Sequence, residues 1–254
     1  MKYFFAILTF LLALKFGNAV YAAPQITVAA AANVQYALDE LKAEFKKETG
    51  IDVSVIIGSS GQLTAQIKAG APYDVFISAD MKYAEALYRD KAAVVSPKVY
   101  ASGSLVVWSM KKKIKFDKEL KILLSSSVKK IASANPATAP YGAAAIEALK
   151  YLGIYDKIKS KLVYGESIAQ ANQFIYSKAV DAGFTAKSVV LSPQMKGKGT
   201  WKEIDPGAYK PIEQGCVILK YGYDNHKDES EKFFRFLFSQ KAKDILVKYG
   251  YKVR

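Results

Sequence analysis

The feature that most limits the folds open to this chain is the alternation of short apolar runs with amphipathic helical segments. In the first half, strands are expected at Ile26–Ala31, Asp52–Ile57 and Asp74–Ser78. A helix is expected after each strand, marked by helical spacing of Val34, Leu38, Leu41 and Phe45 and by the segments Leu63–Ala69 and Met81–Asp90. Strands that alternate with helices predict βαβ units around a mainly parallel sheet, which places the chain in the α/β class.

The pattern resumes after Ser102-Gly103-Ser104, where the chain is expected to cross into a second lobe. Further strands are expected at Leu105–Ser109, Lys129–Ala134, Ala182–Thr185 and Gln214–Leu219, and further helices at Gly142–Leu152, Ile168–Ser177 and Ser230–Tyr249. The last strand is expected to return beside Leu105–Ser109. We therefore predict lobe I from residues 24–102 and 220–254 and an inserted lobe II from residues 103–219, each a mainly parallel sheet flanked by helices. Two crossings would let the lobes hinge over a ligand.

Residues 1–22 have the pattern of a secretory signal peptide. Met1-Lys2 is basic, Tyr3–Leu14 is an apolar run too short to span a bilayer, and small residues follow. Cleavage is expected after Ala22, and it would release a soluble, periplasmic protein. Cys216 is the one cysteine of the chain, so it cannot form an internal disulfide, and its apolar neighbours predict a buried thiol.

The excess of basic residues favours an anionic partner, although not a nucleic acid. The net charge of the full chain is +14, and two of the lysines lie in the signal segment. A basic surface raises the local concentration of anions. The lysines are scattered apart from Lys111–Lys113, and export argues against nucleic acid as the partner.

Four strand-to-helix turns carry small or amide residues where a helix is expected to begin. They are Ala30–Val34, Gly58–Leu63, Ala139–Ala143 and Gly165–Ala169, and none contains lysine or arginine. The N-terminus of a helix has unpaired N–H groups and the positive end of the helix dipole, so it attracts anions. Because each half of the chain has two such turns, we expect an anion site built from neutral donors between the lobes.

The two turns of the first half offer side-chain donors as well as N–H groups. Asn33 is expected to cap its helix and to supply a side-chain N–H₂ group. Ser59 and Ser60 place two hydroxyls at a helix start, between glycines that give the backbone freedom. In the second half, Pro140 is expected at the first helical position, which would leave the N–H groups of Tyr141 and Gly142 free.

A site made of hydroxyl, amide and N–H donors can satisfy only hydrogen-bond acceptors. It should therefore favour a dianion that carries no proton at neutral pH, such as molybdate, tungstate or sulfate. Hydrogen phosphate would need an acceptor for its proton. Glu166 and Asp39 lie near the turns in sequence, but nothing in the sequence directs them inward.

These residues resemble the periplasmic molybdate-binding component of ATP-driven (ABC) importers. The similar stretches are Val28–Val34, Gly58–Leu63, Gly70–Asp80, Asn135–Gly142 and Gly165–Phe174, and the resemblance covers essentially the whole mature chain. It implies the type II two-lobe fold of periplasmic solute-binding proteins and a molybdate or tungstate ligand. It also implies a membrane permease as partner, a monomer, no other cofactor, and a metal bound only as its oxyanion without side-chain ligation.

The resemblance implies ligand contacts at Asn33, Ser60, Tyr141 and Ile168, with Ala32 and Ser59 as further candidates. Tyr141 and Ile168 would donate through their backbone N–H groups. Many members of the family place a tyrosine hydroxyl on the ligand at the position that aligns with Ala186. Since alanine has no side-chain donor, either the Tyr141 hydroxyl or the Asn33 amide would have to replace it.

Two other classes of function remain as alternatives. An enzyme is disfavoured because the one histidine, His226, lies in a polar run that suits neither a catalytic triad nor a histidine-rich metal site. Related two-lobe proteins bind ferric iron through tyrosines, and Tyr221 and Tyr223 come closest to such a motif. A binder of sulfate or ferric iron on the same scaffold is therefore the nearest competitor.

Overall fold

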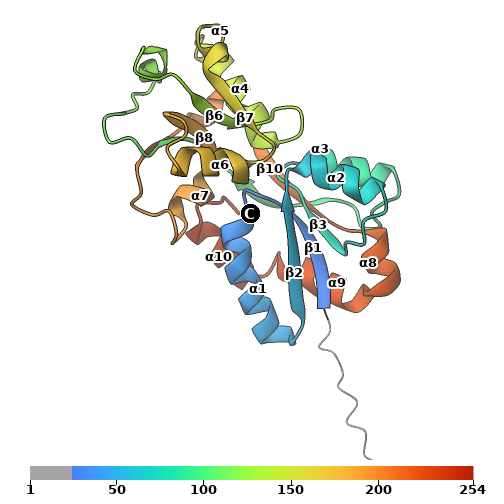
Figure 1. The fold of residues 1–254 in the computed structure, drawn as a ribbon. Coiled ribbons are helices and arrows are strands. Elements are labelled where there is room, and N and C mark those ends of the chain that lie inside the picture. Colours follow the sequence, from blue (N-terminus) through green and yellow to red (C-terminus); the bar gives the residue numbers. More distant parts are fainter. Residues whose placement is uncertain (1–24, 254) are drawn as a thin grey trace, which may run out of the picture.

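The computed structural model describes residues 25–253, which form two α/β lobes (Figure 1). The expected signal peptide and its cleavage site lie outside the described residues. Within the described part, no helix combines the length and apolar character needed to cross a membrane.

Lobe I contains a five-stranded sheet in the order β2-β1-β3-β10-β4. Its strands are β1 (Gln25–Ala31), β2 (Asp52–Gly58), β3 (Val75–Ile77), β4 (Lys98–Gly103) and β10 (Ile212–Ile218). β1 pairs in parallel with β2 and β3, whereas β10 runs antiparallel to β3 and β4. Only β10 opposes the common direction, so the sheet is mainly parallel, as predicted.

Lobe II repeats this arrangement in the order β7-β6-β8-β5-β9. Its strands are β5 (Leu105–Ser109), β6 (Ile131–Ala134), β7 (Leu162–Gly165), β8 (Ala182–Ala186) and β9 (Thr200–Glu203). β6 pairs in parallel with β7 and β8, and β5 runs antiparallel to β8 and β9. In both sheets the single reversed strand is therefore the fourth in order.

The position of β10 corrects one prediction. The strand expected at Gln214–Leu219 does not lie beside Leu105–Ser109, because Cys216 and Val217 pair with β3 of lobe I. Cys216 is buried in the core on one face of this sheet and Val217 in the core on the other. The apolar run thus fills the space between β3 and β4, and the chain returns to lobe I before Ile212 rather than at residue 220.

Two layers of helices cover the sheet of lobe I. Side chains of α1 (Gln35–Thr49), α9 (Lys227–Phe236) and α10 (Gln240–Lys248) pack against one face, and those of α2 (Ser60–Lys68) and α3 (Met81–Arg89) against the other. Successive residues of a strand point to opposite faces, so Val28 and Ala30 join the first core and Ala29 the second. The short α8 (Lys220–Asn225) links β10 to α9.

The helix predicted at Ser230–Tyr249 is interrupted. It consists of α9 and α10, which are separated at Leu237–Ser239. The Ser239 hydroxyl accepts a hydrogen bond from the Ala242 N–H at 3.2 Å and so begins a new helix. Lobe II is covered by α4 (Pro140–Tyr151), α5 (Tyr155–Ile158), α6 (Ile168–Tyr176) and α7 (Lys187–Leu191) around a core that includes Trp108 and Phe184.

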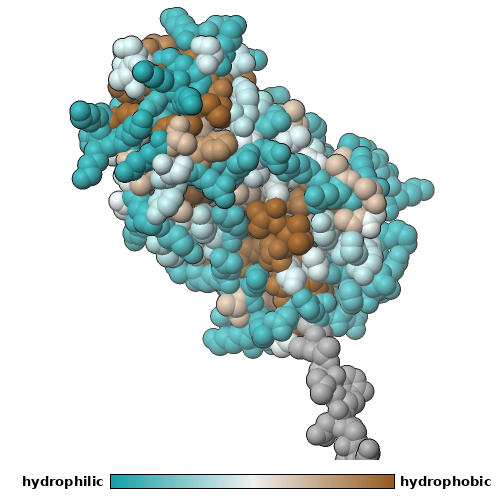
Figure 2. Space-filling view, in the orientation of Figure 1, coloured by the Kyte–Doolittle hydropathy of each residue, from teal (hydrophilic) through white to brown (hydrophobic). Residues whose placement is uncertain are grey.

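The face seen in Figure 2 is mainly hydrophilic, with an apolar patch over β2 and further apolar residues over the upper lobe. β2 is an edge strand, and its side chains Ile56 and Ile57 are 40% and 38% exposed. The patch follows from the position of β2, which has a neighbouring strand on one side only.

Asp181 connects three segments of lobe II. Its Oδ2 accepts the backbone N–H groups of Lys129 at 2.6 Å and Lys130 at 2.8 Å, and its Oδ1 pairs with the Lys111 ammonium. Burial acts to raise the pKa of Asp181, but these donors outweigh burial and hold that pKa below its usual range. The ionised carboxylate therefore stabilises the start of β6.

We expect Asp181→Asn to lower the free energy of unfolding by about 2 kcal/mol at pH 7, because the amide accepts fewer hydrogen bonds and loses the charge. A group whose pKa is lowered by folding contributes stability above its unfolded pKa and loses it as the pH falls through the folded pKa. The difference between wild type and variant should therefore shrink below about pH 4. Urea unfolding at several pH values measures this difference, and a constant difference would contradict the role of the charge.

Candidate functional site

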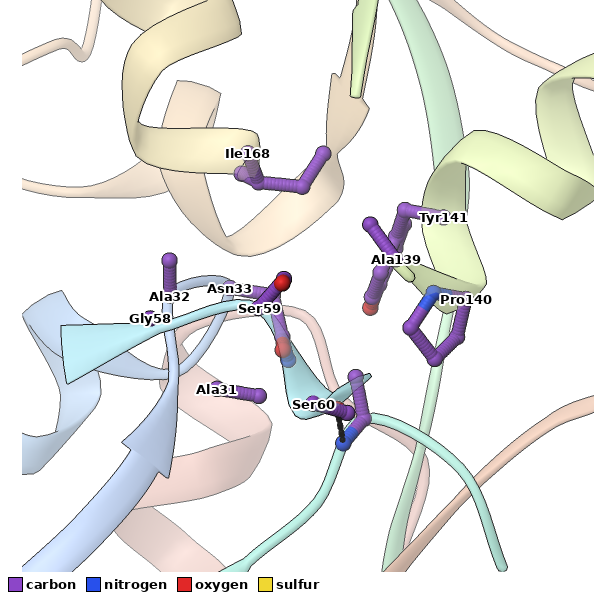
Figure 3. Close-up of a pocket in the computed structure, with 11 residues that line it drawn as sticks. Ala31, Ala32, Asn33, Gly58, Ser59, Ser60, Ala139, Pro140, Tyr141 and Ile168 are labelled. Atoms are coloured by element: carbon purple, nitrogen blue, oxygen red, sulfur yellow. Dashed lines mark hydrogen bonds between the residues drawn. The ribbon is translucent and has the colours of Figure 1, made fainter. Parts of the chain in front are cut away.

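A cavity lies between the lobes where the four turns meet. It is lined by uncharged residues only, namely Ala31, Ala32, Asn33, Gly58, Ser59, Ser60, Ala79, Ala139, Pro140, Tyr141 and Ile168. In Figure 3, Asn33 and the two serines of lobe I face Ala139, Tyr141 and Ile168 of lobe II. The cavity volume is about 10 Å³, which is about the space of one water-sized sphere. Pockets for organic ligands measure roughly 300–1,000 Å³, so this cavity suits a small ion.

Ser60 is the first residue of α2 and is fully buried. Ser59 caps the helix through a capping box with Gln62, in which the Ser59 hydroxyl donates to Gln62 Oε1 at 2.9 Å. Ser60 Oγ accepts the Ala79 N–H at 2.9 Å, drawn as the dashed line in Figure 3. The Ser60 hydroxyl hydrogen is therefore available to an acceptor in the cavity, whereas the hydroxyl of Ser59 is already used.

The starts of α4 and α6 direct backbone N–H groups at the cavity from lobe II. Pro140 occupies the first turn of α4, as predicted, and no described group accepts the N–H of the next residue, Tyr141. The N–H of Gly142 is not free as expected, because it donates to the Ala139 carbonyl at 2.9 Å. Ile168 is the first residue of α6, after its cap Ser167, so its N–H also has no intrahelical acceptor.

Asn33 differs from its predicted role as a helix cap. The residue at the N-cap of α1 is Val34, and it makes no side-chain capping bond. Asn33 Nδ2 donates to Gln214 Oε1 at 2.8 Å and to the Tyr251 hydroxyl at 3.0 Å. Its Oδ1 is buried and has no partner among the described residues. The side chain that lines the cavity therefore uses its donors on the protein itself.

The hydroxyl of Tyr141 accepts a hydrogen bond from Gln214 Nε2 at 3.2 Å, and none of the described residues accepts its hydrogen. Ala186 ends β8, is fully buried and does not line the cavity. Tyr141 and Asn33, the two residues considered from sequence as replacements for the missing donor, both line the cavity.

The sequence did not point to the cluster behind the cavity. Gln214 of β10 is fully buried. Its Oε1 accepts from Asn33 Nδ2 and from the Tyr100 hydroxyl at 2.6 Å, and its Nε2 donates to the Tyr141 hydroxyl. Burial raises the pKa of Tyr100 and Tyr141 well above the usual value and raises the pKa of Tyr251 to about 12, so all three phenols stay neutral. The only feature of the sequence that could have indicated this cluster is a polar glutamine next to the apolar run 215–219.

The lobes touch around the cavity. The Gly61 N–H donates to the Thr138 carbonyl at 2.9 Å, and the Ser188 hydroxyl donates to the Asn33 carbonyl at 2.7 Å. At the rim, Gln62 Nε2 donates to Glu166 Oε2 at 3.3 Å. Glu166 and Asp39 do not line the cavity, so it contains no carboxylate.

The residues considered for other functions lie elsewhere. His226 Nδ1 is 2.8 Å from Oδ1 of Asp74, at the junction of α8 and α9. Tyr221 and Tyr223 of α8 are each 40% exposed and do not line the cavity. Among the described residues, no group of three or more histidine, cysteine or acidic side chains could hold a metal ion.

Comparison with known proteins identifies the family. Residues 26–252 match the family of bacterial extracellular solute-binding proteins. The chain is 37% identical over 230 residues to the molybdate-binding protein ModA of Azotobacter vinelandii, with 90% of each chain covered. It is 38% identical over 242 residues to ModA of Rhodobacter capsulatus, with 94% of this chain and 93% of the relative covered.

A solved structure supports the same assignment. The periplasmic molybdate-binding protein of Azotobacter vinelandii superposes with a TM-score of 0.85 at 35% identity, and the match covers 90% of this chain and 99% of that one. The two lobes, each a mixed sheet flanked by helices, thus form a type II periplasmic binding fold. The chain belongs to the ModA family of bacterial extracellular solute-binding proteins.

Proposed function

We propose that this protein binds molybdate or tungstate between its lobes in the periplasm and delivers the oxyanion to the membrane permease of an ABC importer. The observation that carries the proposal is a small cavity that has free N–H and hydroxyl donors and no charged residue. The protein acts as a monomer, needs no cofactor, and makes or breaks no bond in its ligand.

The donors are arranged to hold a tetrahedral dianion. Ser60 would donate through its hydroxyl and its N–H from lobe I, and Tyr141 and Ile168 through their N–H groups from lobe II. The positive ends of α2, α4 and α6 meet at the cavity and favour negative charge there. Fixed dipoles in a site that excludes water can stabilise a dianion without a counter-charge.

Asn33 would supply the donor that Ala186 cannot. Its backbone N–H has no acceptor among the described residues, and its side chain borders the cavity. Ala32 and the backbone of Ser59 complete the wall on that side. The side-chain hydroxyl of Ser59 is excluded from this role because it belongs to the capping box.

The same donor set argues against the alternatives on this scaffold. A cavity lined by donors repels a cation, and no acidic side chain lines it, so ferric iron finds no carboxylate ligand there. Sulfate has the same charge as molybdate and remains the closest rival. The two ions differ in size, so the fit of the closed lobes around the ion determines which one binds more tightly.

Calorimetric titration of ligand-free mature protein with molybdate, tungstate, sulfate and phosphate tests the proposal. We expect tight one-to-one binding of molybdate and tungstate and much weaker binding of sulfate and phosphate. No detectable binding of molybdate and tungstate, together with strong binding of sulfate, would identify the site as a sulfate site.

Closure of the lobes can be tested at Gly61. A Cβ atom at this position would lie 2.9 Å from the Tyr83 hydroxyl and 3.0 Å from Thr138 of lobe II. Gly61→Ala should therefore disfavour the closed form and weaken oxyanion binding about fivefold, for a cost of about 1 kcal/mol. Gly207→Ala is the matched control, because a Cβ atom there has no contact closer than 3.4 Å. Equal affinity in both variants would mean that binding does not need this contact.

A further inference from the structure

The side-chain amide of Asn33 is turned the wrong way for an oxyanion. Its Nδ2 hydrogens are both donated to the protein, to Gln214 and Tyr251, and its buried Oδ1 has no partner among the described residues. Oδ1 is therefore the end of the amide that is left for a ligand. An acceptor next to an anion is repelled, and a buried acceptor with no partner is unfavourable even in the empty protein. The arrangement therefore calls for a second orientation of this amide.

Asn33 cannot turn alone. If only its amide rotated, Oδ1 would face Gln214 Oε1, which now accepts from Nδ2 at 2.8 Å. Two oxygen acceptors at that distance repel each other. Gln214 must therefore rotate with Asn33, so that its Nε2 donates to Asn33 Oδ1.

We propose that Gln214 is a positioning residue that sets which end of the Asn33 amide faces the cavity, and thereby the preference for oxyanions without a proton. This inference rests on the proposed function and adds to it a residue that does not contact the ligand. With both amides turned, Asn33 Nδ2 offers two hydrogens to a dianion. With both amides as they stand, Asn33 Oδ1 offers an acceptor to a protonated anion.

The turned arrangement satisfies the surrounding groups. Gln214 Nε2 would use its two hydrogens on Asn33 Oδ1 and on the Tyr100 hydroxyl, which lies 2.6 Å from the same end of Gln214. Gln214 Oε1 would accept the Tyr141 hydroxyl hydrogen across the present 3.2 Å contact. The Tyr251 hydroxyl now accepts from Asn33 Nδ2 at 3.0 Å and donates to the Asn33 backbone carbonyl at 2.9 Å. It would turn its hydrogen to Asn33 Oδ1, and the carbonyl would keep the hydrogen bond that the Ser188 hydroxyl donates at 2.7 Å.

The surrounding residues allow this exchange because they are neutral and can both donate and accept. The phenols of Tyr100, Tyr141 and Tyr251 keep their protons at neutral pH, so each can reverse its role. Gly103 provides the room in which Gln214 meets Tyr141, since a Cβ atom there would collide with the Tyr141 hydroxyl and lie 2.7 Å from Gln214 Nε2. No charged group needs to move.

The test compares Gln214→Glu with Gln214→Leu. A carboxylate only accepts, so the carboxylate introduced by Gln214→Glu would hold Asn33 Nδ2 toward itself and leave Oδ1 facing the cavity. A leucine makes no hydrogen bond, so Asn33 would be free to present Nδ2 while Tyr251 donates to its oxygen. The measurement is calorimetric affinity for molybdate and for phosphate, at a pH where phosphate is mainly the hydrogen phosphate dianion.

We expect the ratio of molybdate affinity to phosphate affinity to fall at least tenfold in Gln214→Glu and to stay within about threefold of wild type in Gln214→Leu. The added negative charge weakens both dianions and so cancels in the ratio. An equal change of the ratio in both variants, or no change in Gln214→Glu, would overturn the positioning role and leave Gln214 as a packing residue.

The experiment separates this inference from the proposed function. If the wild-type protein does not prefer molybdate over phosphate, the proposed function is wrong. If the wild-type protein prefers molybdate and the ratio of molybdate affinity to phosphate affinity is unchanged in Gln214→Glu, only the proposed role of Gln214 is wrong. If Gln214→Glu does not fold, as judged by thermal unfolding, Asn33→Asp is the second variant. Its acceptor-only side chain must lower the same ratio at least tenfold for the proposal to stand.

Discussion

Replacing Ile168 by proline is expected to weaken molybdate binding about 10- to 150-fold and to leave the helix intact. A hydrogen bond to a charged group contributes about 1.5–3 kcal/mol, which corresponds to this range of affinity. Ile168 is the first residue of α6, the one helical position where proline is favoured and where the missing N–H breaks no intrahelical bond. The substitution therefore removes a single donor from the proposed site.

The backbone before this position already suits proline. Ser167 has φ −144° and ψ 172°, which is the extended conformation that a residue before proline prefers. The cap is also kept, because Ser167 Oγ accepts from the N–H of Gln170, further along the helix. Changes in the start of α6 should thus be small, and the far-ultraviolet circular dichroism should match wild type.

Ile168→Ala is the matched control, since it removes the same side chain and keeps the N–H. We expect its affinity for molybdate to remain within about threefold of wild type, because alanine keeps the N–H that would bind the ligand. If alanine and proline weakened binding equally, the Ile168 side chain and not its N–H would be what the ligand needs. Calorimetric titration of the two variants beside wild type gives the answer directly.

The sequence predicted the local features of the fold better than the long-range ones. Helix starts follow from neighbouring residues, so α4 begins at the proline Pro140 and α6 begins after the cap Ser167. The partner of a strand depends on which gap in a distant sheet its side chains fill. β10 therefore pairs with β3, about 140 residues earlier in the chain, although its own sequence suits either lobe.

In the candidate site, too, the local features could be predicted from the sequence and the long-range ones could not. Donors that a turn supplies through its backbone, at Ser60, Tyr141 and Ile168, could be predicted from caps and prolines, and the structure brings them to one cavity. The orientation of Asn33 could not be predicted, because it depends on Gln214 and Tyr251, which are 181 and 218 residues away. A side-chain amide has two different ends, and only its three-dimensional neighbours determine which end faces a ligand.

Ser60→Ala should have the other large effect, on stability as well as on affinity. The hydroxyl hydrogen of Ser60 is a free side-chain donor in the wall of the cavity, so its loss should weaken molybdate binding about 10- to 150-fold. Ser60 Oγ also accepts the N–H of Ala79, which is buried. The variant leaves that N–H unpaired, which should lower the free energy of unfolding by about 1–3 kcal/mol.

Ser59→Ala separates the two effects. The Ser59 hydroxyl is held by Gln62 in the capping box, so its loss should cost about 1 kcal/mol of stability with little change in affinity. Denaturant unfolding and calorimetric titration of both variants then give, for each serine, the change in the free energy of unfolding and the change in molybdate affinity. If Ser60→Ala lost stability but bound molybdate as wild type does, Ser60 would support Ala79 without contacting the ligand. The oxyanion would then depend on backbone N–H groups and on the Asn33 amide.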